Sequence, residues 1–172
     1  MLMSKIKVFF TLTGYQLTWL ACVFGENKYS NPYLGIFVGI FFLALYFYIN
    51  QNKYKFLKLS LLISIPGYFF DTLMVYSNIY QFNSAINFLY LPYWMIILWL
   101  SFSTLFDEIL IFLKRYKILA ILLSAILGPF TYYLGEPIGV ISINNINLFF
   151  IFMTLFWVLL MIYYLEIVLK KI

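Results

Sequence analysis

The sequence predicts an all-α integral membrane protein, a polytopic bundle of six transmembrane helices with both termini in the cytoplasm. Of its 172 residues, 65% are hydrophobic and only 10% are charged, whereas about a quarter of the residues of a soluble domain are charged. The mean hydropathy is +0.97. So few charges cannot cover a hydrophobic core with a wettable surface, which excludes a soluble enzyme, a disordered protein and a disulfide scaffold.

Six apolar stretches predict the six helices, because a helix needs about 20 residues to cross the roughly 30 Å hydrocarbon layer of a bilayer. The expected spans are residues 8–25, 33–49, 56–76, 92–113, 118–134 and 147–169. The first resembles a signal peptide, but Trp19 is unsuited to a cleavage box and five further spans follow, so we expect an uncleaved helix. The loops are short, and we expect residues 1–172 to form a single domain.

The basic residues orient the bundle. Ten of the eleven Lys and Arg residues fall in the N-terminal segment, in 53–58, in 114–117 and in 170–171, and only Lys28 falls in an alternate loop. Because basic residues accumulate in cytoplasmic loops, both termini are predicted to be cytoplasmic. The net charge of +5 therefore belongs to these loops, and we expect no nucleic-acid partner.

Histidine is absent and Cys22 is the one cysteine. A single cysteine excludes an internal disulfide and a CxxC site. Without His, the commonest ligand of transition metals is missing. We therefore expect neither a metal site nor a cofactor.

Asp71 is the most informative polar residue, because an ionisable group inside a span costs about 2.5–3.5 kcal/mol and marks a functional site. Pro66 and Gly67 lie one turn before it. Proline leaves the carbonyl of Leu62 without its helical donor, and a broken helix beside a buried carboxylate is how transporters build ligand sites. The alternative is a packing kink, with Asp71 hydrogen-bonded to a Tyr or Ser of a neighbouring helix.

Asp107 and Glu108 lie in the inner half of the fourth span. Adjacent helical positions point about 100° apart, so we do not expect them to form a carboxylate pair on one face. At least one is expected to reach Lys114 and Arg115 in the following basic segment, which favours a structural role.

Other polar and small residues favour structural contacts. Gln16, in the middle of the first span, can bond across helices or contact a ligand. Glu166 and Lys170 have the spacing of a helical ion pair. Gly35 and Gly39 form a GxxxG pattern, which suits close helix contact and suggests a homodimer through that face.

The segment 128–139 combines three glycines with two prolines. We expect these glycines and prolines, which include Gly128 and Pro129, to break the fifth helix and to shape its outer end, where Tyr132 and Glu136 lie. Irregular backbone at membrane depth must be buried in protein or line a cavity. The alternative is an ordinary helix end followed by a tight turn.

Four blocks, in the right order, resemble the DUF2878 family of bacterial membrane proteins. They are Tyr15–Val23, Gly67 with Asp71, Pro92–Trp99, and Gly128–Gly139. After Thr104 and Leu105 the family pattern has Asn and His, and this chain has Phe106, Asp107 and Glu108. The resemblance implies a multi-pass protein of the bacterial inner membrane and no particular activity. It singles out Gln16, Trp19, Asp71, Pro92, Trp94, Trp99, Gly128 and Pro129.

Three classes of function fit. Handling of a lipid or small molecule is favoured, because it needs a polar cavity between helices and few catalytic groups. A non-catalytic subunit or scaffold needs only packing surfaces. A lipid-modifying enzyme needs an acid–base pair or a nucleophile, and Asp71 with Glu136 is the only plausible acidic pair. The candidate cavity residues are Asp71, Gln16, Pro66, Gly67, Trp19, Trp94, Trp99, Gly128, Pro129, Tyr132 and Glu136.

Overall fold

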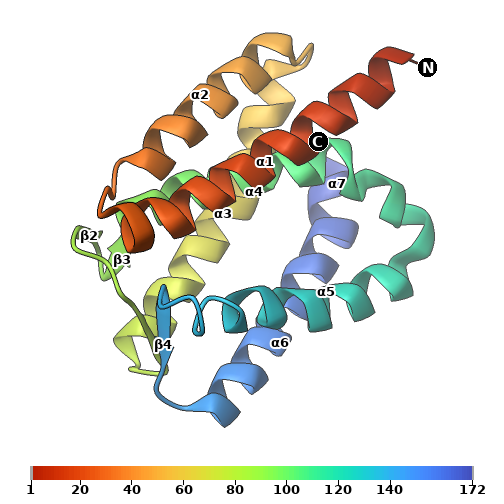
Figure 1. Ribbon diagram of the computed structural model, residues 1–172. Coiled ribbons are helices and arrows are strands. Elements are labelled where there is room, and N and C mark those ends of the chain that lie inside the picture. The colour runs from red at the N-terminus through yellow and green to blue at the C-terminus, as the bar shows by residue number, and fades with distance from the viewer. Residues whose placement is uncertain (1, 172) are drawn as a thin grey trace. The chain divides into compact units, whose positions relative to one another are not determined.

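The computed structural model describes residues 2–171, and helices dominate it (Figure 1). The six long α-helices are α1 (Leu2–Tyr29), α2 (Leu34–Ile49), α3 (Lys53–Tyr76), α4 (Tyr93–Glu108), α5 (Lys117–Tyr133) and α6 (Ile146–Tyr163). Each falls on one of the six apolar stretches, which confirms the all-α class. A 3₁₀ helix, Leu110–Tyr116, follows α4, and α6 continues through a π-helical turn, Tyr164–Val168, into the short α7 (Leu169–Lys171).

Three helical stretches are long and apolar enough to cross a membrane: Lys5–Tyr29, Lys53–Tyr76 and Ile146–Lys171. Tyr93–Glu108 and Leu110–Tyr133 together qualify as one bent pair, and Leu34–Ile49 is a shorter apolar helix. The fourth stretch, expected to run to about residue 113, is divided, because α4 ends at Glu108 and a 3₁₀ helix follows. The carboxylates of the last two residues of α4 are held there by side chains of other helices.

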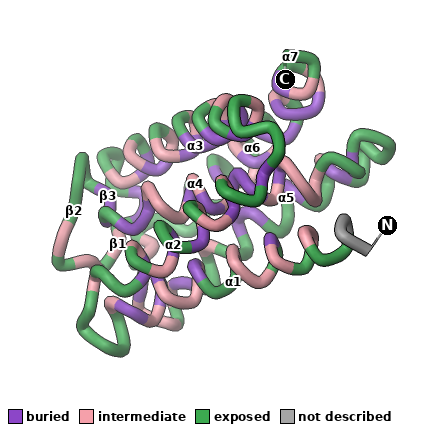
Figure 2. Tube along the Cα trace, turned by 90° about the horizontal axis from the view of Figure 1, so that it is seen from above, coloured by how far each residue is buried: buried purple, intermediate pink, exposed green. Residues whose placement is uncertain are grey.

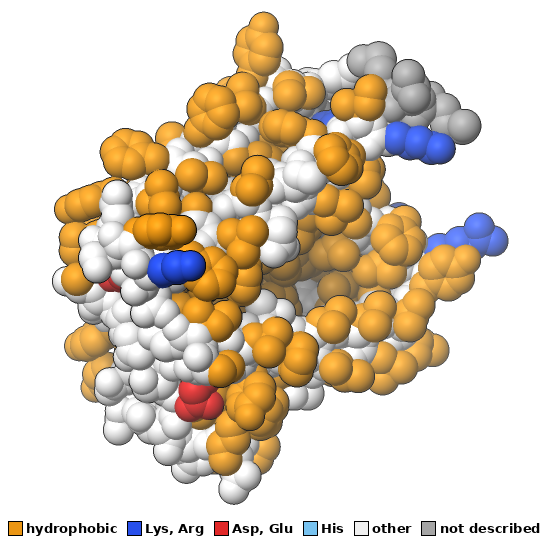
Figure 3. Space-filling view, viewed as in Figure 1, with side chains coloured by type: hydrophobic (Ala, Val, Ile, Leu, Met, Phe, Trp, Pro, Cys, Tyr) orange, Lys and Arg blue, Asp and Glu red, His pale blue; other side chains and the backbone are white. Residues whose placement is uncertain are grey.

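The surface has the character of a membrane protein. Large hydrophobic side chains stand out from the helices, among them Phe37 (71% exposed), Tyr48 (82%) and Ile118 (77%). Exposed positions run along the helices as well as through the loops (Figure 2), and hydrophobic side chains predominate on the face shown in Figure 3. Apolar surface on this scale is foreign to a soluble monomer.

The chain forms two compact units, Met1–Ile65 with Tyr93–Ile111, and Pro66–Pro92 with Phe112–Ile172. In the first unit α1, α2 and α4 pack against one another. A Cβ added to Gly35 would lie 2.6 Å from Cys22 Cα, and one added to Gly39 would lie 2.9 Å from Thr18 Cγ2 and 2.1 Å from Ile97 Cγ2. Gly35 and Gly39 thus make close contacts with α1 and α4 of their own chain, and a homodimer through this face stays a prediction.

In the second unit α5 packs on α6. A Cβ on Gly128 would lie 2.2 Å from Trp157 Cγ, so glycine permits this close approach. The helix α5 runs through Gly128 and Pro129 and ends at Tyr133, so the expected break is wrong and the alternative, an ordinary helix end followed by turns, is what the structure has. The ring of Pro129 leaves the carbonyl of Ala125 without a helical donor, and Thr154 Oγ1 of α6 donates to that carbonyl at 3.4 Å. The helix α3 also runs without a break through Pro66.

Two short antiparallel strand pairs lie in the loops of the second unit, and the sequence reasoning did not foresee them. Strand β1 (Tyr80–Phe82) pairs with β4 (Ile141–Ile143), and β2 (Asn87–Phe88) pairs with β3 (Leu91–Pro92). The β1–β4 pair joins the loop after α3 to the loop after α5. Strand β1 follows the C-terminal end of α3, the helix that contains Asp71.

Candidate functional site

Asp71 is completely buried in the C-terminal part of α3 and accepts hydrogen bonds from two tyrosines. Tyr80, on β1, donates its hydroxyl to Asp71 Oδ1 at 2.6 Å. Tyr132, near the end of α5, donates its hydroxyl to both carboxylate oxygens, at 3.0 and 2.9 Å. The carboxylate therefore ties three segments of the second unit together. The hydrogen bond to a Tyr of a neighbouring helix, which belonged to the alternative interpretation of Asp71, is confirmed for Tyr132.

Tyr80 was missed by the sequence reasoning, because it lies outside the apolar stretches. It is fully buried, and its ring packs edge-on against Phe149 with centroids 5.9 Å apart. Burial, and then the charge of Asp71, raise the pKa of Tyr80 well above its usual value. The phenol therefore stays protonated and acts as a donor to Asp71. The feature of the sequence that could have identified Tyr80 is its position nine residues after Asp71.

Around Tyr80, the segments 78–83 and 136–145 form what we name the loop cap. Beside the β1–β4 pairing, Asn83 Nδ2 donates to the carbonyl of Gly139 at 3.0 Å, and Asn144 Nδ2 donates to Asn78 Oδ1 at 2.8 Å. Glu136 Oε1 accepts the backbone N–H of Ile143 at 3.1 Å. Glu136, expected as a possible acidic partner of Asp71, thus helps to hold the loop cap together.

Four of the candidate cavity residues lie in the first unit, whereas Asp71 lies in the second. Gln16 is exposed on α1, and Trp19 is partly buried. Trp94 is buried and donates Nε1–H to Glu26 Oε2 at 2.8 Å, which links the start of α4 to the end of α1. Trp99 is buried as well. The two buried tryptophans, Trp94 and Trp99, therefore belong to the core of the first unit.

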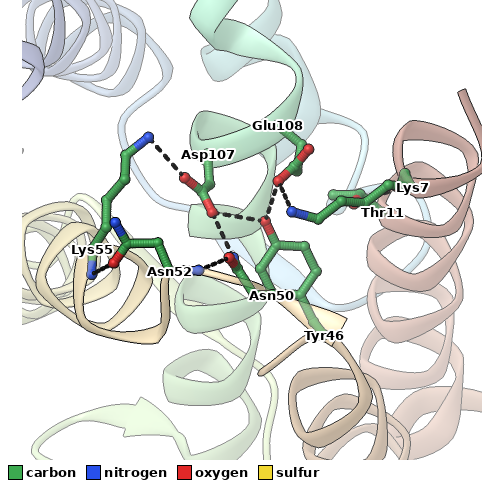
Figure 4. Close-up of polar contacts among 8 residues, drawn as sticks. All are labelled: Lys7, Thr11, Tyr46, Asn50, Asn52, Lys55, Asp107 and Glu108. Atoms are coloured by element: carbon green, nitrogen blue, oxygen red, sulfur yellow. Dashed lines mark hydrogen bonds and ion pairs between the residues drawn. The ribbon is translucent and has the colours of Figure 1, made fainter. Parts of the chain in front are cut away.

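A second polar cluster, in the first unit, centres on Asp107 and Glu108 (Figure 4). Asp107 Oδ2 accepts from the Tyr46 hydroxyl at 2.9 Å and from Asn50 Nδ2 at 2.8 Å, and Asp107 Oδ1 lies 3.4 Å from Lys55 Nζ. Glu108 Oε1 pairs with Lys7 and lies 3.3 Å from the Tyr46 hydroxyl. The two carboxylates therefore converge on one phenol, contrary to the expectation from their 100° separation.

The cluster has an electrostatic cause. Two carboxylates in the last turn of α4 face the negative end of that helix, and Lys55 in the first turn of α3 faces the positive end of its own. Each of these charges is destabilising at its own helix end. The ion pair between the carboxylate and the lysine offsets both effects. The cations come from α1 and α3, and not, as the sequence suggested, from the segment around Lys114 and Arg115.

The two clusters differ in the chemistry they offer. In the cluster of the first unit, each carboxylate pairs with a lysine, and Asn50 and Tyr46 donate to the second oxygen of Asp107, so its groups are used in joining helices. The Asp71 cluster presents a buried carboxylate to hydroxyl donors. Within residues 2–171, no three His, Cys, Asp or Glu side chains gather where they could hold a metal ion.

The motif blocks fall on defined places in the fold. Tyr15–Val23 lies in α1, Gly67 and Asp71 lie in α3, Pro92–Trp99 spans the end of β3 and the start of α4, and Gly128–Gly139 covers the end of α5 and part of the loop cap. No curated protein and no solved structure matches the chain. The family described as "Protein of unknown function (DUF2878)" matches residues 8–163. Since this match covers most of the sequence, the chain belongs to the DUF2878 family.

Proposed function

We propose that this DUF2878 member is a multi-pass protein of the bacterial cytoplasmic membrane, with six spans and cytoplasmic termini, that binds a lipid or small molecule at Asp71. The apolar helices and the apolar surface support the membrane assignment. The buried Asp71 carboxylate, with its two hydroxyl donors, is the observation that carries the binding proposal.

Contacts within the first unit support the alternation of six spans. The pairs Lys7–Glu108, Asn50–Asp107 and Lys55–Asp107 gather the start of α1, the end of α2, the start of α3 and the end of α4. The Trp94–Glu26 bond joins the start of α4 to the end of α1. Helix ends group in these two ways when successive helices cross the membrane in alternate directions.

Contacts within the second unit agree with the same alternation. The β1–β4 pair joins the loop after α3 to the loop after α5, and Lys117 at the start of α5 pairs with Glu166 after the end of α6. The 16 residues of α2 give about 24 Å of helix at 1.5 Å per residue. A short span of this kind is accommodated by local thinning of the bilayer and by flanking residues.

The chemistry at Asp71 supports a ligand that donates hydrogen bonds. Tyr80 and Tyr132 are neutral donors, so neither neutralises the carboxylate to which it donates. A hydroxyl or ammonium group of a ligand can use the same acceptor oxygens. Both kinds of group occur on lipid headgroups and on small polar metabolites.

The proposal is tested by comparing the lipids and polar metabolites of a deletion strain that carries the wild type, Asp71→Asn or Glu166→Gln. We expect the deletion to change at least one species, the wild type and Glu166→Gln to restore it, and folded Asp71→Asn to fail. Glu166 belongs to an exposed ion pair and serves as the control. Full restoration by Asp71→Asn contradicts the proposal.

A non-catalytic subunit or scaffold is the second candidate, because the Asp71 bonds also join α3, β1 and α5. In that case Asp71→Asn lowers the amount of folded protein, and the phenotype follows that amount. Measuring the folded yield of each variant in the membrane beside the lipid profile separates the two functions.

A further inference from the structure

The loop cap reaches Asp71 through Tyr80. In β1 and in β4, the first residue is buried and the second is exposed, so Tyr80 and Ile141 point inward while Gln81 and Ser142 point outward. The hydroxyl of Tyr80 meets Asp71 Oδ1 at 2.6 Å. A side chain of the cap is therefore bonded to the carboxylate that we propose as the ligand site.

The loop cap is bonded within itself, so that its two segments can move together. The backbone N–H of Asn83 donates to the carbonyl of Val140 at 2.9 Å, and that of Asn144 donates to the carbonyl of Ile79 at 2.9 Å. Asn78 and Gly139, at φ values of 55° and 83°, occupy left-handed turns just before β1 and β4. Turns of this kind at element ends are where hinge motion is absorbed.

A ligand and Tyr80 compete for the same acceptor. Asp71 Oδ1 already accepts from both Tyr80 and Tyr132, and Tyr132 also bonds Oδ2, so a ligand that donates to Oδ1 competes with these phenols for its lone pairs. When the ligand displaces Tyr80, the loss of a buried hydrogen bond to a charged group weakens the attachment of β1. We propose that the loop cap is a gate over the Asp71 site. The Tyr80–Asp71 hydrogen bond, which we name the latch, holds the cap closed, and a ligand hydroxyl or ammonium group that displaces Tyr80 releases it. This inference rests on the proposed binding at Asp71.

The latch is tested by hydrogen exchange of the purified full-length protein in phosphatidylcholine nanodiscs. Tyr80→Phe keeps the ring and removes the donor, so backbone amides of 80–83 and 140–143 should exchange about tenfold faster or more. Tyr133→Phe changes a tyrosine outside the Asp71 bonds and should leave these rates unchanged. Equal rates in Tyr80→Phe and the wild type overturn the latch.

Asp71→Asn is the second variant, in case Tyr80→Phe does not fold. It keeps the shape of the side chain and removes the charge that strengthens the bond. We expect faster exchange in the loop cap and unchanged exchange in α1 and α2, which lie in the first unit. Wild-type rates in a folded Asp71→Asn protein also overturn the latch.

The release step is tested with lipids that differ in their donors. The choline headgroup has no N–H or O–H, whereas phosphatidylethanolamine carries an ammonium and phosphatidylglycerol carries hydroxyls. We expect one of these two lipids, or free ethanolamine or glycerol in the buffer, to speed exchange in the wild-type cap and not in Asp71→Asn. An effect from lipid alone assigns the ligand to the bilayer, and an effect from the free compound assigns it to solution. No effect from any of the four contradicts release.

The two proposals fail in different ways. If Asp71→Asn abolishes restoration of the deletion strain while Tyr80→Phe leaves cap exchange unchanged, the binding function stands and the gate falls. If Tyr80→Phe speeds exchange while Asp71→Asn restores the strain fully, the cap is latched as described and the binding function falls.

Discussion

A phenol donating to a buried carboxylate occurs in both units. Tyr46 donates to Asp107 at 2.9 Å in the first unit, and Tyr80 and Tyr132 donate to Asp71 in the second. Tyrosine suits this task, because its ring packs among apolar side chains while its hydroxyl bonds the charge. A hydrogen bond to a charged group contributes about 1.5–3 kcal/mol, enough for a single residue to decide whether a short helix stays in place.

Asp107→Asn should destabilise the protein by about 1–3 kcal/mol, because the variant loses the charge that Lys55, Asn50 and Tyr46 stabilise. The Asp107 side chain is 6% exposed, so water replaces few of these contacts. The midpoint of thermal unfolding in detergent measures the loss. Glu166→Gln removes an ion pair whose acid is 40% exposed and should cost less. Equal decreases of the unfolding midpoint in the two variants would show that burial of the Asp107 cluster adds no stability.

The protonation of Tyr80 makes stability depend on pH at the alkaline end. Its pKa is raised in the folded protein, so its contribution is complete below the unfolded value of about 10 and is lost as pH rises toward the folded value. Between pH 8 and about 11.5, the unfolding midpoint of the wild type should therefore fall more steeply than that of Tyr80→Phe. Every other residue is the same in the two proteins, so the difference in slope belongs to Tyr80. Parallel curves would contradict the buried donor.

Where two helices meet, glycine lets them approach closely, and this contact takes the place of large interlocking side chains. Gly35 on α2 lies against the backbone of Cys22 on α1, and Gly128 on α5 lies against the ring of Trp157 on α6. Small residues give such contacts in membranes, where apolar burial supplies no driving force between helices. The GxxxG pattern was therefore correctly associated with close contact, but the partner is a helix of the same chain.

Gly35→Ala should destabilise the α1–α2 contact by about 1–3 kcal/mol, the usual cost of overpacking. The added Cβ meets backbone atoms of Cys22 at 2.6 and 2.8 Å, which cannot swing away. Gly25→Ala is the matched control, because its Cβ would lie 3.0 Å or more from its neighbours and the same gain in helix propensity applies. Unfolding midpoints of the two variants measure the difference. A Gly35→Ala protein as stable as Gly25→Ala would show that the helices can move apart freely.

How far the sequence predicts the structure also varies from element to element. Hydropathy located all six long helices, because each is a continuous apolar run. The effect of Pro129 was misjudged, because its local cost is offset by Thr154, a residue of another helix. The β1–β4 pair was missed, because three-residue strands show no period of two and their partners lie some sixty residues apart.

The two clusters were predictable to different degrees. Asp71 and Tyr132 were foreseen from an expensive charge in a span and from the family block, whereas Tyr80 was not, because its burial depends on the pairing of two loops. For Asp107 and Glu108, helix geometry gave the directions of the side chains. It did not give the positions of Lys7 and Lys55, which fold from distant parts of the chain.

For the whole molecule, the distribution of charge and the contacts within each unit support the proposed topology by different routes. The basic residues predict which side of the membrane is cytoplasmic, without reference to structure. The Lys7, Lys55, Asp107 and Glu108 contacts bring several of the same segments together without reference to charge counting along the chain. Helix length alone is less informative, because it selects three spans and one bent pair.

Single cysteines, one in or beside each connection between successive long helices, distinguish six spans from three. The substitutions are Asn31→Cys, Gln51→Cys, Ser84→Cys, Arg115→Cys and Asn147→Cys. In intact spheroplasts, an impermeant thiol reagent should label Asn31→Cys, Ser84→Cys and Asn147→Cys, and should label Gln51→Cys and Arg115→Cys only after lysis. Cys22 is buried, and the wild type serves as the blank. If α2 did not cross, the cysteines at 31 and 51, on either side of it, would react from the same side. Since α3 is long and apolar enough to cross the membrane, that result would also place the C-terminal part of α3, with Asp71, toward the opposite side, and the positive-inside argument would fail at the basic segment 53–58.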